Sequence, residues 1–186
     1  MISIIDMNCK KDSLGFYEFV LPIITIIKNT QEYEVKHYSE VGQTDTDNCT
    51  GIVLSGTALR DKETLKHVED FAWIKKCEKP ILGICAGMQT IGLVFDSTLT
   101  ECLEIGMKQI TTIKENPLFS SSFRAYELHT CSIRPSTDFD TLAQSKKCIQ
   151  AMRHKEKNIY GVLFHPEVRN EEIIKRFVLL SRSKQE

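Results

Sequence analysis

Hydrophobic residues follow two different periods along the chain. Short runs rich in β-branched residues alternate with longer segments in which apolar residues recur at helical spacing. The short runs predict strands at residues 2–6, 33–37, 51–54, 80–84, part of 105–113, 125–133 and 159–164, and the longer segments predict helices at about 14–28 and 61–77. Strands that alternate with helices are typical of βαβ units, so the pattern indicates an α/β fold with a mainly parallel central sheet.

The last predicted helix covers the C-terminal part of the chain. Asn170 is its expected N-cap, and Glu171 and Glu172 in the first turn suit the positive end of the helix dipole. An apolar stripe along this helix indicates a face that packs on the core, and it consists of Ile173, Ile174, Phe177, Val178 and Leu180. The predicted loops are too short to act as linkers, so we expect residues 1–186 to form a single domain.

The charge balance excludes some classes of partner. The chain has 24 Lys and Arg residues against 25 Asp and Glu residues, which gives a formal net charge of -1. Such a chain has no strong field to hold a polyphosphate or an anionic bilayer, so we expect neither nucleic acid nor a membrane as partner. The apolar stretch at 19–27 contains Pro22 and falls short of the roughly 20 residues that a membrane span requires.

The cysteines show no disulfide or metal pattern. There are seven of them, at positions 9, 49, 77, 85, 102, 131 and 148, with no CxxC pair and no even-numbered framework. The N-terminus begins with a strand-like run and lacks the features of a secretory signal. We therefore expect free thiols, a cytoplasmic location and no metal site.

One cysteine stands out by its position. Cys85 lies between a predicted strand and a predicted helix, with Gly83 and Gly87 two residues to either side. This GxCxG spacing matches a nucleophile elbow, in which residues without side chains let strand and helix approach closely. A thiol at a helix N-terminus is favoured as thiolate, so we predict that Cys85 is a nucleophile and that the amide of Ala86 stabilises an oxyanion. A buried structural cysteine is the alternative, since free cysteines are mostly packed in cores.

A base for this nucleophile is offered by His165. It follows the predicted strand 159–164, at the sheet edge where sites of α/β proteins usually lie. Pro166 restricts His165 to extended conformations, and Glu167 can accept a hydrogen bond from the imidazole nitrogen that faces away from the thiol. Cys85, His165 and Glu167 would then be nucleophile, base and orienting acid. The sequence alone does not show that His165 lies near Cys85. The alternative is that His165 is a buried structural histidine.

These segments resemble those of class I, triad-type glutamine amidotransferases, and the resemblance spans nearly the whole chain. Residues 83–89 (GICAGMQ) resemble the nucleophile segment of that family, and residues 160–168 (YGVLFHPEV) resemble its histidine and glutamate segment. The resemblance implies a flavodoxin-like three-layer sandwich. It also implies that Cys85 attacks the side-chain amide of glutamine, that His165 protonates the leaving ammonia, and that water hydrolyses the thioester to glutamate.

Further site residues follow from the same resemblance. The oxyanion hole is expected from the amides of Thr57 and Ala86, and the amino-acid end of glutamine is expected to bind at Gly56, Gln89, His129, Thr130 and Cys131. The chain departs from the family pattern at Thr57, where a second glycine is usual, and at Leu128, Thr130 and Leu163, where polar or small residues are usual. A β-branched residue disfavours positive φ, so Thr57 limits how the oxyanion loop can turn.

Three segments also resemble the glutaminase subunit of archaeal two-subunit GMP synthases: 104–106 (EIG), 116–119 (NPLF) and 127–129 (ELH). The histidine-glycine-lysine and histidine-serine-leucine segments of the branches that serve chorismate substrates are absent. The resemblance implies a separate ATP-dependent synthetase subunit that makes GMP from XMP. ATP and Mg²⁺ are then expected on that partner, with no cofactor in this chain, and ammonia must cross the contact without meeting bulk water.

Three other interpretations remain open at this point. The triad is also compatible with a γ-glutamyl hydrolase that acts alone. A non-catalytic, regulatory subunit would explain the departures at Thr57 and Leu163. A redox-sensing role for Cys85 is the third, although the neighbouring sequence offers no resolving cysteine.

Overall fold

The structure is a computed structural model, and it describes residues 1–42, 46 and 48–182. The strands in this part are β1 (Ile2–Asp6), β2 (Tyr33–His37), β3 (Gly51–Leu54), β4 (Ile81–Ile84), β5 (Thr98–Thr112), β6 (Phe123–Arg134), β7 (Phe139–Gln144), β8 (Ile149–His154) and β9 (Ile159–Val162). The helices are η1 (Phe16–Val20), α1 (Leu21–Ile27), η2 (Tyr38–Glu40), α2 (Glu63–Lys66), η4 (Val68–Lys75), α3 (Ala86–Val94), α4 (Pro166–Arg169) and α5 (Glu171–Arg182).

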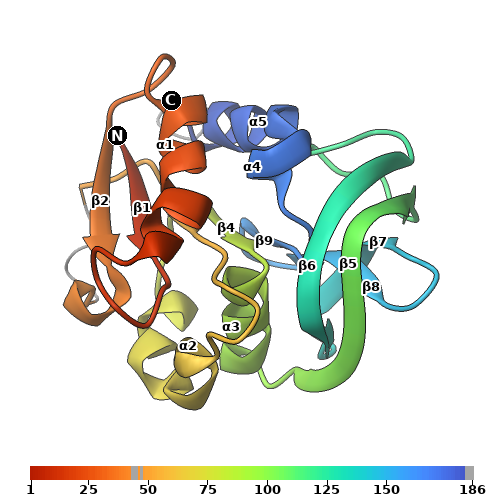
Figure 1. Cartoon of the computed structure of the whole chain (residues 1–186). Helices are drawn as coiled ribbons and strands as arrows, with labels where there is room; N and C mark the ends of the chain where they lie inside the picture. Colours follow the sequence, from red (N-terminus) through yellow and green to blue (C-terminus); the bar gives the residue numbers. More distant parts are fainter. Residues whose placement is uncertain (43–45, 47, 183–186) are drawn as a thin grey trace.

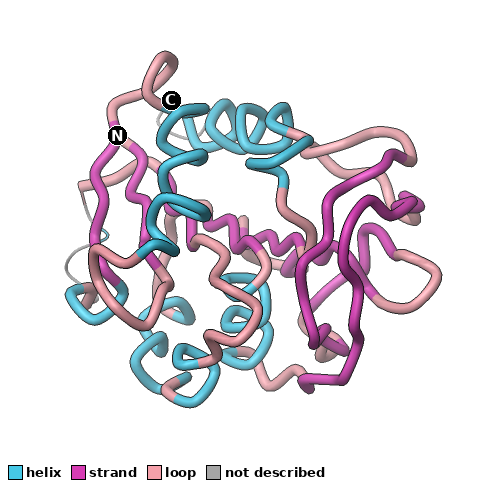
Figure 2. The backbone as a smooth tube through the Cα atoms, viewed as in Figure 1, coloured by secondary structure: helices cyan, strands magenta, loops and turns pink. Residues whose placement is uncertain are grey.

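These strands form one sheet in the order β2-β1-β3-β4-β9-β8-β7-β5-β6. The strands from β2 to β9 in this order pair in parallel, and the sheet continues beyond β9 with antiparallel pairs. Figures 1 and 2 show the long strands β5 and β6 curving together at the end of the molecule opposite β2. The parallel part is the one that the sequence predicts, and the antiparallel extension makes the sheet as a whole mixed.

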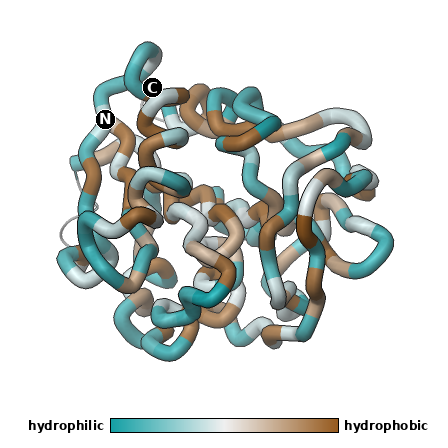
Figure 3. Tube along the Cα trace, viewed as in Figure 1, coloured by the Kyte–Doolittle hydropathy of each residue, from teal (hydrophilic) through white to brown (hydrophobic). Residues whose placement is uncertain are grey.

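Helices cover both faces of the parallel strands. On one face α1 and α5 pack together, and their apolar side chains, such as Ile23 and Phe177, form a buried cluster with Val162 of β9. On the other face η4 and α3 pack together, with Ile74 and Met88 in a second buried cluster. Figure 1 shows these helices on opposite sides of the strands, and Figure 3 shows hydrophobic residues along α1 and the strands between the layers. The expected flavodoxin-like α/β sandwich is therefore confirmed.

Most strand predictions are confirmed, with two omissions. The predictions at 2–6, 33–37 and 51–54 coincide with β1, β2 and β3. The hairpin of β7 and β8 was not predicted, because these strands mix buried and half-exposed residues without a clean alternation. β5 is also much longer than predicted, because its N-terminal half is a mostly polar strand that pairs with β6.

Two helix predictions need correction. The segment predicted as one helix at 61–77 consists of the short α2 and the 3₁₀-helix η4, which are separated at His67. Asn170 does precede α5, but its side chain does not cap it: Oδ1 is buried and accepts no hydrogen bond from the described residues, while the backbone oxygen accepts one from Ile173 N at 2.9 Å. None of the helices in the described ranges is long and apolar enough to cross a bilayer.

Candidate active site

Cys85 occupies a strained turn between β4 and α3. Its backbone angles are φ 47° and ψ -101°, a region that residues other than glycine rarely adopt. A Cβ atom on Gly83 would lie 2.5 Å from the backbone carbon of Gly87, and one on Gly87 would lie 2.6 Å from the carbonyl oxygen of Leu54. The strand and the helix therefore approach so closely that only glycine fits on either side of Cys85, as the GxCxG spacing predicts.

His165 and Glu167 form a buried pair next to this turn. Nδ1 of His165 lies 2.7 Å from Oε1 of Glu167, and the two residues are 1% and 6% exposed. The backbone N–H of His165 donates to Tyr126 O of β6 at 2.9 Å, which ties the segment after β9 to the neighbouring wall. A Cβ atom on Gly56 would lie only 2.7 Å from Cε1 of His165, so the imidazole packs directly on the loop after β3.

The electrostatics favour a charged imidazole. Burial alone would lower the pKa of His165, but the Glu167 carboxylate and the Cys85 sulfur outweigh it and raise that pKa well above its usual value. Nε2 of His165 has no hydrogen-bond partner among the described residues, and the Cys85 thiol points instead to Leu128 O at 3.8 Å. The predicted triad residues are thus neighbours, with the imidazole nitrogen that a nucleophile would use left open.

Cys85 opens into a narrow cleft with a volume of about 20 Å³. Most of the predicted site residues line it, namely Thr57, Ala86, Gln89, His129, Thr130 and Cys131. Gly56 is not among the lining residues and lies against His165 instead. Such a volume holds about one water molecule, so a glutamine side chain does not fit the cleft in this conformation.

Hydrogen bonds define two sides of this cleft. Gln89 Nε2 donates to Cys131 O at 2.8 Å and thereby ties α3 to β6. On the other side Thr57 Oγ1 donates to Asp61 O at 3.1 Å. Thr57 is not among the non-glycine residues with positive φ in the described chain, so its loop has a conformation that a β-branched residue tolerates. The first N–H groups of α3, including that of Ala86, have no acceptor within the helix, and Ala86 itself lines the cleft.

Sequence reasoning missed Lys62, which also lines the cleft. Its Nζ lies 3.5 Å from Cys131 Sγ, so the ammonium group reaches across from the loop before α2 to β6. Within the predicted helix at 61–77 Lys62 is one of several polar surface positions, and nothing in the local pattern marks it. Its role follows only from the contact between two segments that are far apart in the chain.

Two buried carboxylates behind the cleft were also missed. Glu127 and His129 follow each other on the inner face of β6, with His129 Nε2 3.1 Å from Oε2 of Glu127 and 3.8 Å from Oε2 of Glu104. Burial raises the pKa of Glu127, and the neighbouring His129 only partly offsets this. The sequence pattern gives no signal for this buried face of β6, because the larger apolar residues Tyr126 and Leu128 lie on the other face of the strand.

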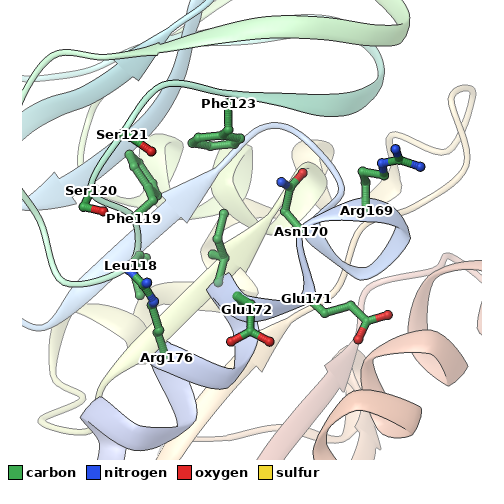
Figure 4. Close-up of a pocket in the computed structure, with 11 residues that line it drawn as sticks. Leu118, Phe119, Ser120, Ser121, Phe123, Arg169, Asn170, Glu171, Glu172 and Arg176 are labelled. Carbon is green, nitrogen blue, oxygen red and sulfur yellow. The ribbon is translucent and has the colours of Figure 1, made fainter.

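A larger hollow of about 420 Å³ lies elsewhere, between the loop at 118–123 and the segment 169–176. Figure 4 shows Phe119 and Phe123 on its loop side and Asn170 and Glu172 on its helical side. It contains neither a cysteine nor a histidine. The cleft at Cys85 is therefore the candidate active site, although it is much the smaller of the two.

Comparisons with known proteins agree with this geometry. The family model of class-I glutamine amidotransferases matches residues 22–179, and the chain belongs to that family. A solved structure from Thermoplasma acidophilum covers 98% of this chain and 95% of its own length, with a TM-score of 0.85 at 24% identity. A glutamine amidotransferase from Thermotoga maritima has a TM-score of 0.69 at 20% identity and covers 97% and 81%. At these identities the two structures show the fold.

Curated relatives narrow the comparison to one branch of the family. The A subunit of the glutamine-hydrolysing GMP synthase from Methanocaldococcus jannaschii is 39% identical over 138 residues, which are 68% of this chain and 71% of the relative. Its counterpart from Picrophilus torridus is 33% identical over 166 residues, which are 83% of each chain.

Proposed function

We propose that this chain is the glutaminase subunit of a two-subunit GMP synthase. The observation that carries the proposal is the strained Cys85 beside the buried His165–Glu167 pair, at the base of a cleft lined by the predicted glutamine-binding residues. The similarity to the two GMP synthase relatives supports the same branch. The acceptor of the ammonia is then XMP, on a separate ATP-dependent synthetase subunit.

The reaction uses the three residues in turn. The Cys85 sulfur attacks the side-chain amide carbon of glutamine, and the oxygen that becomes negative is held by the N–H groups of Ala86 and Thr57. The His165 imidazolium gives its proton to the departing ammonia, which leaves a thioester on Cys85. His165 then removes a proton from water as that water attacks the thioester, and glutamate leaves. Glu167 keeps the imidazole oriented and stabilises its charge throughout.

The closed cleft suggests that the resting chain depends on its partner. About 20 Å³ does not admit glutamine, and the wall at residues 57–62 is the segment that has to open. A synthetase that binds next to this wall would couple glutamine hydrolysis to the presence of an acceptor. It would also shield the ammonia from bulk water, where protonation would remove its nucleophilicity.

Lys62 supplies a charge that suits the substrate. Free glutamine carries an α-carboxylate, and the Lys62 ammonium lies at the wall of the cleft opposite α3. We assign to it an electrostatic contact with this carboxylate, made when the wall opens. The contact would favour free glutamine over an amide without a carboxylate.

The test is glutamate release from glutamine by the pure chain, alone and with the ATP-dependent synthetase encoded in the same genome. We expect little release alone, strong stimulation with the partner and XMP, and none from Cys85→Ala under either condition. Folded protein that releases no glutamate even with the partner, ATP and XMP would contradict the proposal. Release from γ-glutamyl peptides with inertness toward glutamine would favour a γ-glutamyl hydrolase instead.

The same closed cleft also favours a second candidate, a non-catalytic subunit that kept the fold. A thiol-directed glutamine analogue separates the two, because it reacts only where glutamine binds next to an activated sulfur. Labelling of Cys85 in the presence of the partner supports the glutaminase. Failure to label it under those conditions supports the non-catalytic subunit.

A further inference from the structure

Cys102 and Cys148 lie together outside the proposed triad. Their Sγ atoms are 2.7 Å apart and hydrogen-bonded, although the residues are 46 positions apart in the chain. Cys102 is part of β5, and Cys148 lies in the turn between β7 and β8. Both thiols are free. No other contact between two cysteine sulfurs is recorded for residues 1–42, 46 and 48–182 at hydrogen-bond distance.

Cys102 lies in a β-bulge of β5. The register of β5 against β6 shifts between Glu101 and Glu104, so Cys102 and Leu103 together face the single residue Thr130. A bulge of this kind redirects side chains and is often found next to functional sites. The backbone oxygen of Cys102 in turn holds His129 Nδ1 at 2.9 Å, which links the bulge to the wall of the glutamine cleft.

Small molecules can reach the pair from one side. Cys102 lines a surface hollow of about 370 Å³, together with Lys62, Leu103 and Thr130. Cys148 does not line this hollow, and Gln150 Nε2 is 3.5 Å from its sulfur. Cys102 is thus the thiol that a reagent in the hollow meets, and Cys148, whose sulfur lies 2.7 Å from it, is placed to act as the resolving cysteine.

A proton acceptor is also in place. The Cys148 thiol points to Oε2 of Glu104 at 3.5 Å, and that oxygen is held by Ser145 Oγ at 2.7 Å and by Gln150 Nε2 at 2.8 Å. Burial raises the pKa of both thiols, and most strongly that of Cys148. Glu104 is therefore the group to which Cys148 passes its proton when it attacks.

We propose that Cys102 and Cys148 are a modification site at which a low-molecular-weight disulfide forms an intramolecular disulfide. The Cys102 sulfur attacks one sulfur of the reagent RS–SR, the S–S bond of the reagent breaks, and one RS⁻ leaves and takes up the Cys102 proton. The Cys148 sulfur then attacks Cys102 Sγ and loses its proton to Glu104, the bond from Cys102 Sγ to the RS group breaks, and the second RS⁻ leaves and takes up this proton from Glu104 to become RSH. The two cysteines lose two electrons and two protons in total, and the reagent gains both.

The cross-link is expected to be slow to form and slow to reduce. Thiols with a raised pKa supply little thiolate at neutral pH, and they are also poor leaving groups when the disulfide is attacked. It would join β5 covalently to the turn between β7 and β8, whereas the ladder between β5 and β7 lies at Thr111 and Thr112. It therefore fixes the bulge that holds His129.

The experiment uses hydroxyethyl disulfide and the full chain in the Cys85→Ala background, which removes the proposed nucleophile as a competing thiol. Peptide mapping should join the peptides that contain Cys102 and Cys148, with the loss of two hydrogen atoms and no hydroxyethyl thiol retained on either cysteine. Cys148→Ser should instead retain one hydroxyethyl thiol on Cys102. Cys9→Ser, which removes an exposed thiol far from the pair in sequence, should still form the cross-link.

Thermal unfolding supplies a second readout. The cross-linked chain should unfold at a higher temperature than the reduced chain, dithiothreitol should reverse the increase, and Cys148→Ser should show none. A stable adduct on Cys102 of the chain with Cys148 intact would overturn the proposal, as would a cross-link that uses another cysteine. Retention of stoichiometric zinc by Cys102, Glu104 and Cys148 after dialysis, with no cross-link, would also overturn it and make this cluster a metal site instead.

Discussion

Nδ1 of His165 lies 2.7 Å from Oε1 of Glu167, and neither side chain is accessible to water to any useful extent. This contact fixes the direction of the imidazole, and it leaves Nε2 as the ring nitrogen without a hydrogen-bond partner among the described residues. The pair also explains why an imidazole that is almost fully buried still has a raised pKa. Replacing the carboxylate should therefore affect both activity and its dependence on pH.

Glu167→Gln should lower glutaminase activity by roughly 10²–10⁴-fold, the range that general acid–base catalysis usually contributes. The amide keeps the size of the side chain but no longer stabilises the charge on His165. The measurement is kcat for glutamate release with the synthetase partner present. Glu172→Gln, an exposed partner of Lys175 on α5, is the matched control and should keep full activity. Equal activity of Glu167→Gln and the unchanged chain would remove Glu167 from the triad.

The same substitution predicts a change in stability with pH. The pKa of His165 is above its ordinary value of 6.5 in the folded chain, so its contribution to stability is complete below that value and is lost as the pH rises through the folded pKa. In Glu167→Gln most of this contribution should be missing. The difference in the free energy of unfolding between the two proteins should thus be largest at low pH and shrink as the pH rises. Urea unfolding over a series of pH values measures this difference in the free energy of unfolding. A difference that grows with pH would contradict the role of Glu167 in stabilising the charged imidazole.

The backbone of Cys85 offers a separate test, because φ 47° and ψ -101° strain any residue with a Cβ atom. Cys85→Ala and Cys85→Gly both remove the thiol and should both abolish glutamate release. Glycine relieves the strain, although it also adds freedom to the unfolded chain, so Cys85→Gly should be more stable than Cys85→Ala by about 1 kcal/mol. Chemical denaturation of the two variants gives the difference. Greater stability of the alanine variant would show that the turn is not strained.

Features that depend on neighbouring residues could be predicted from the sequence, whereas contacts between distant segments could not. Cys85, Gly83 and Gly87 act through one turn, and His165 and Glu167 are two positions apart, so local patterns suffice to predict them. Lys62 could not be predicted in the same way, because its role depends on a contact with Cys131 across distant segments. The hairpin of β7 and β8 was missed for another reason, since both strands lie inside the sheet and their buried residues do not alternate with exposed ones.

Replacing Glu127 should stabilise the folded chain at neutral pH, whereas replacing Glu167 should destabilise it. Burial raises the pKa of Glu127 above its ordinary value of 4.5, so its folded form resists ionisation. Below pH 4.5 the carboxyl is protonated in both the folded and the unfolded chain, so its burial does not lower the free energy of unfolding. As the pH rises through the folded pKa, the free energy of unfolding decreases. Glu127→Gln should therefore unfold at a higher temperature than the unchanged chain at neutral pH, and the gain should disappear in acid. A variant that is less stable at neutral pH would mean that the contact with His129 outweighs the burial.

Lys62→Met should raise the KM for glutamine by roughly tenfold and leave kcat nearly unchanged, since a contact with the α-carboxylate stabilises bound substrate and transition state alike. Lys62→Arg keeps the charge and should restore most of the affinity. Lys66→Met removes a nearby lysine that pairs with Glu63 and does not line the cleft, so it is the matched control.

A substrate without the carboxylate makes the test of Lys62 specific. Steady-state kinetics with 4-aminobutanamide, which keeps the amide but has no carboxylate, should give the same kcat/KM for Lys62→Met and the unchanged chain. A purely structural role for Lys62 would lower kcat/KM for both substrates by the same factor. Because Lys62 is exposed and its contact is partly screened by water, an effect much larger than tenfold would also argue for such a structural role. Only a loss confined to the substrate that carries the carboxylate assigns the contact to the ammonium group.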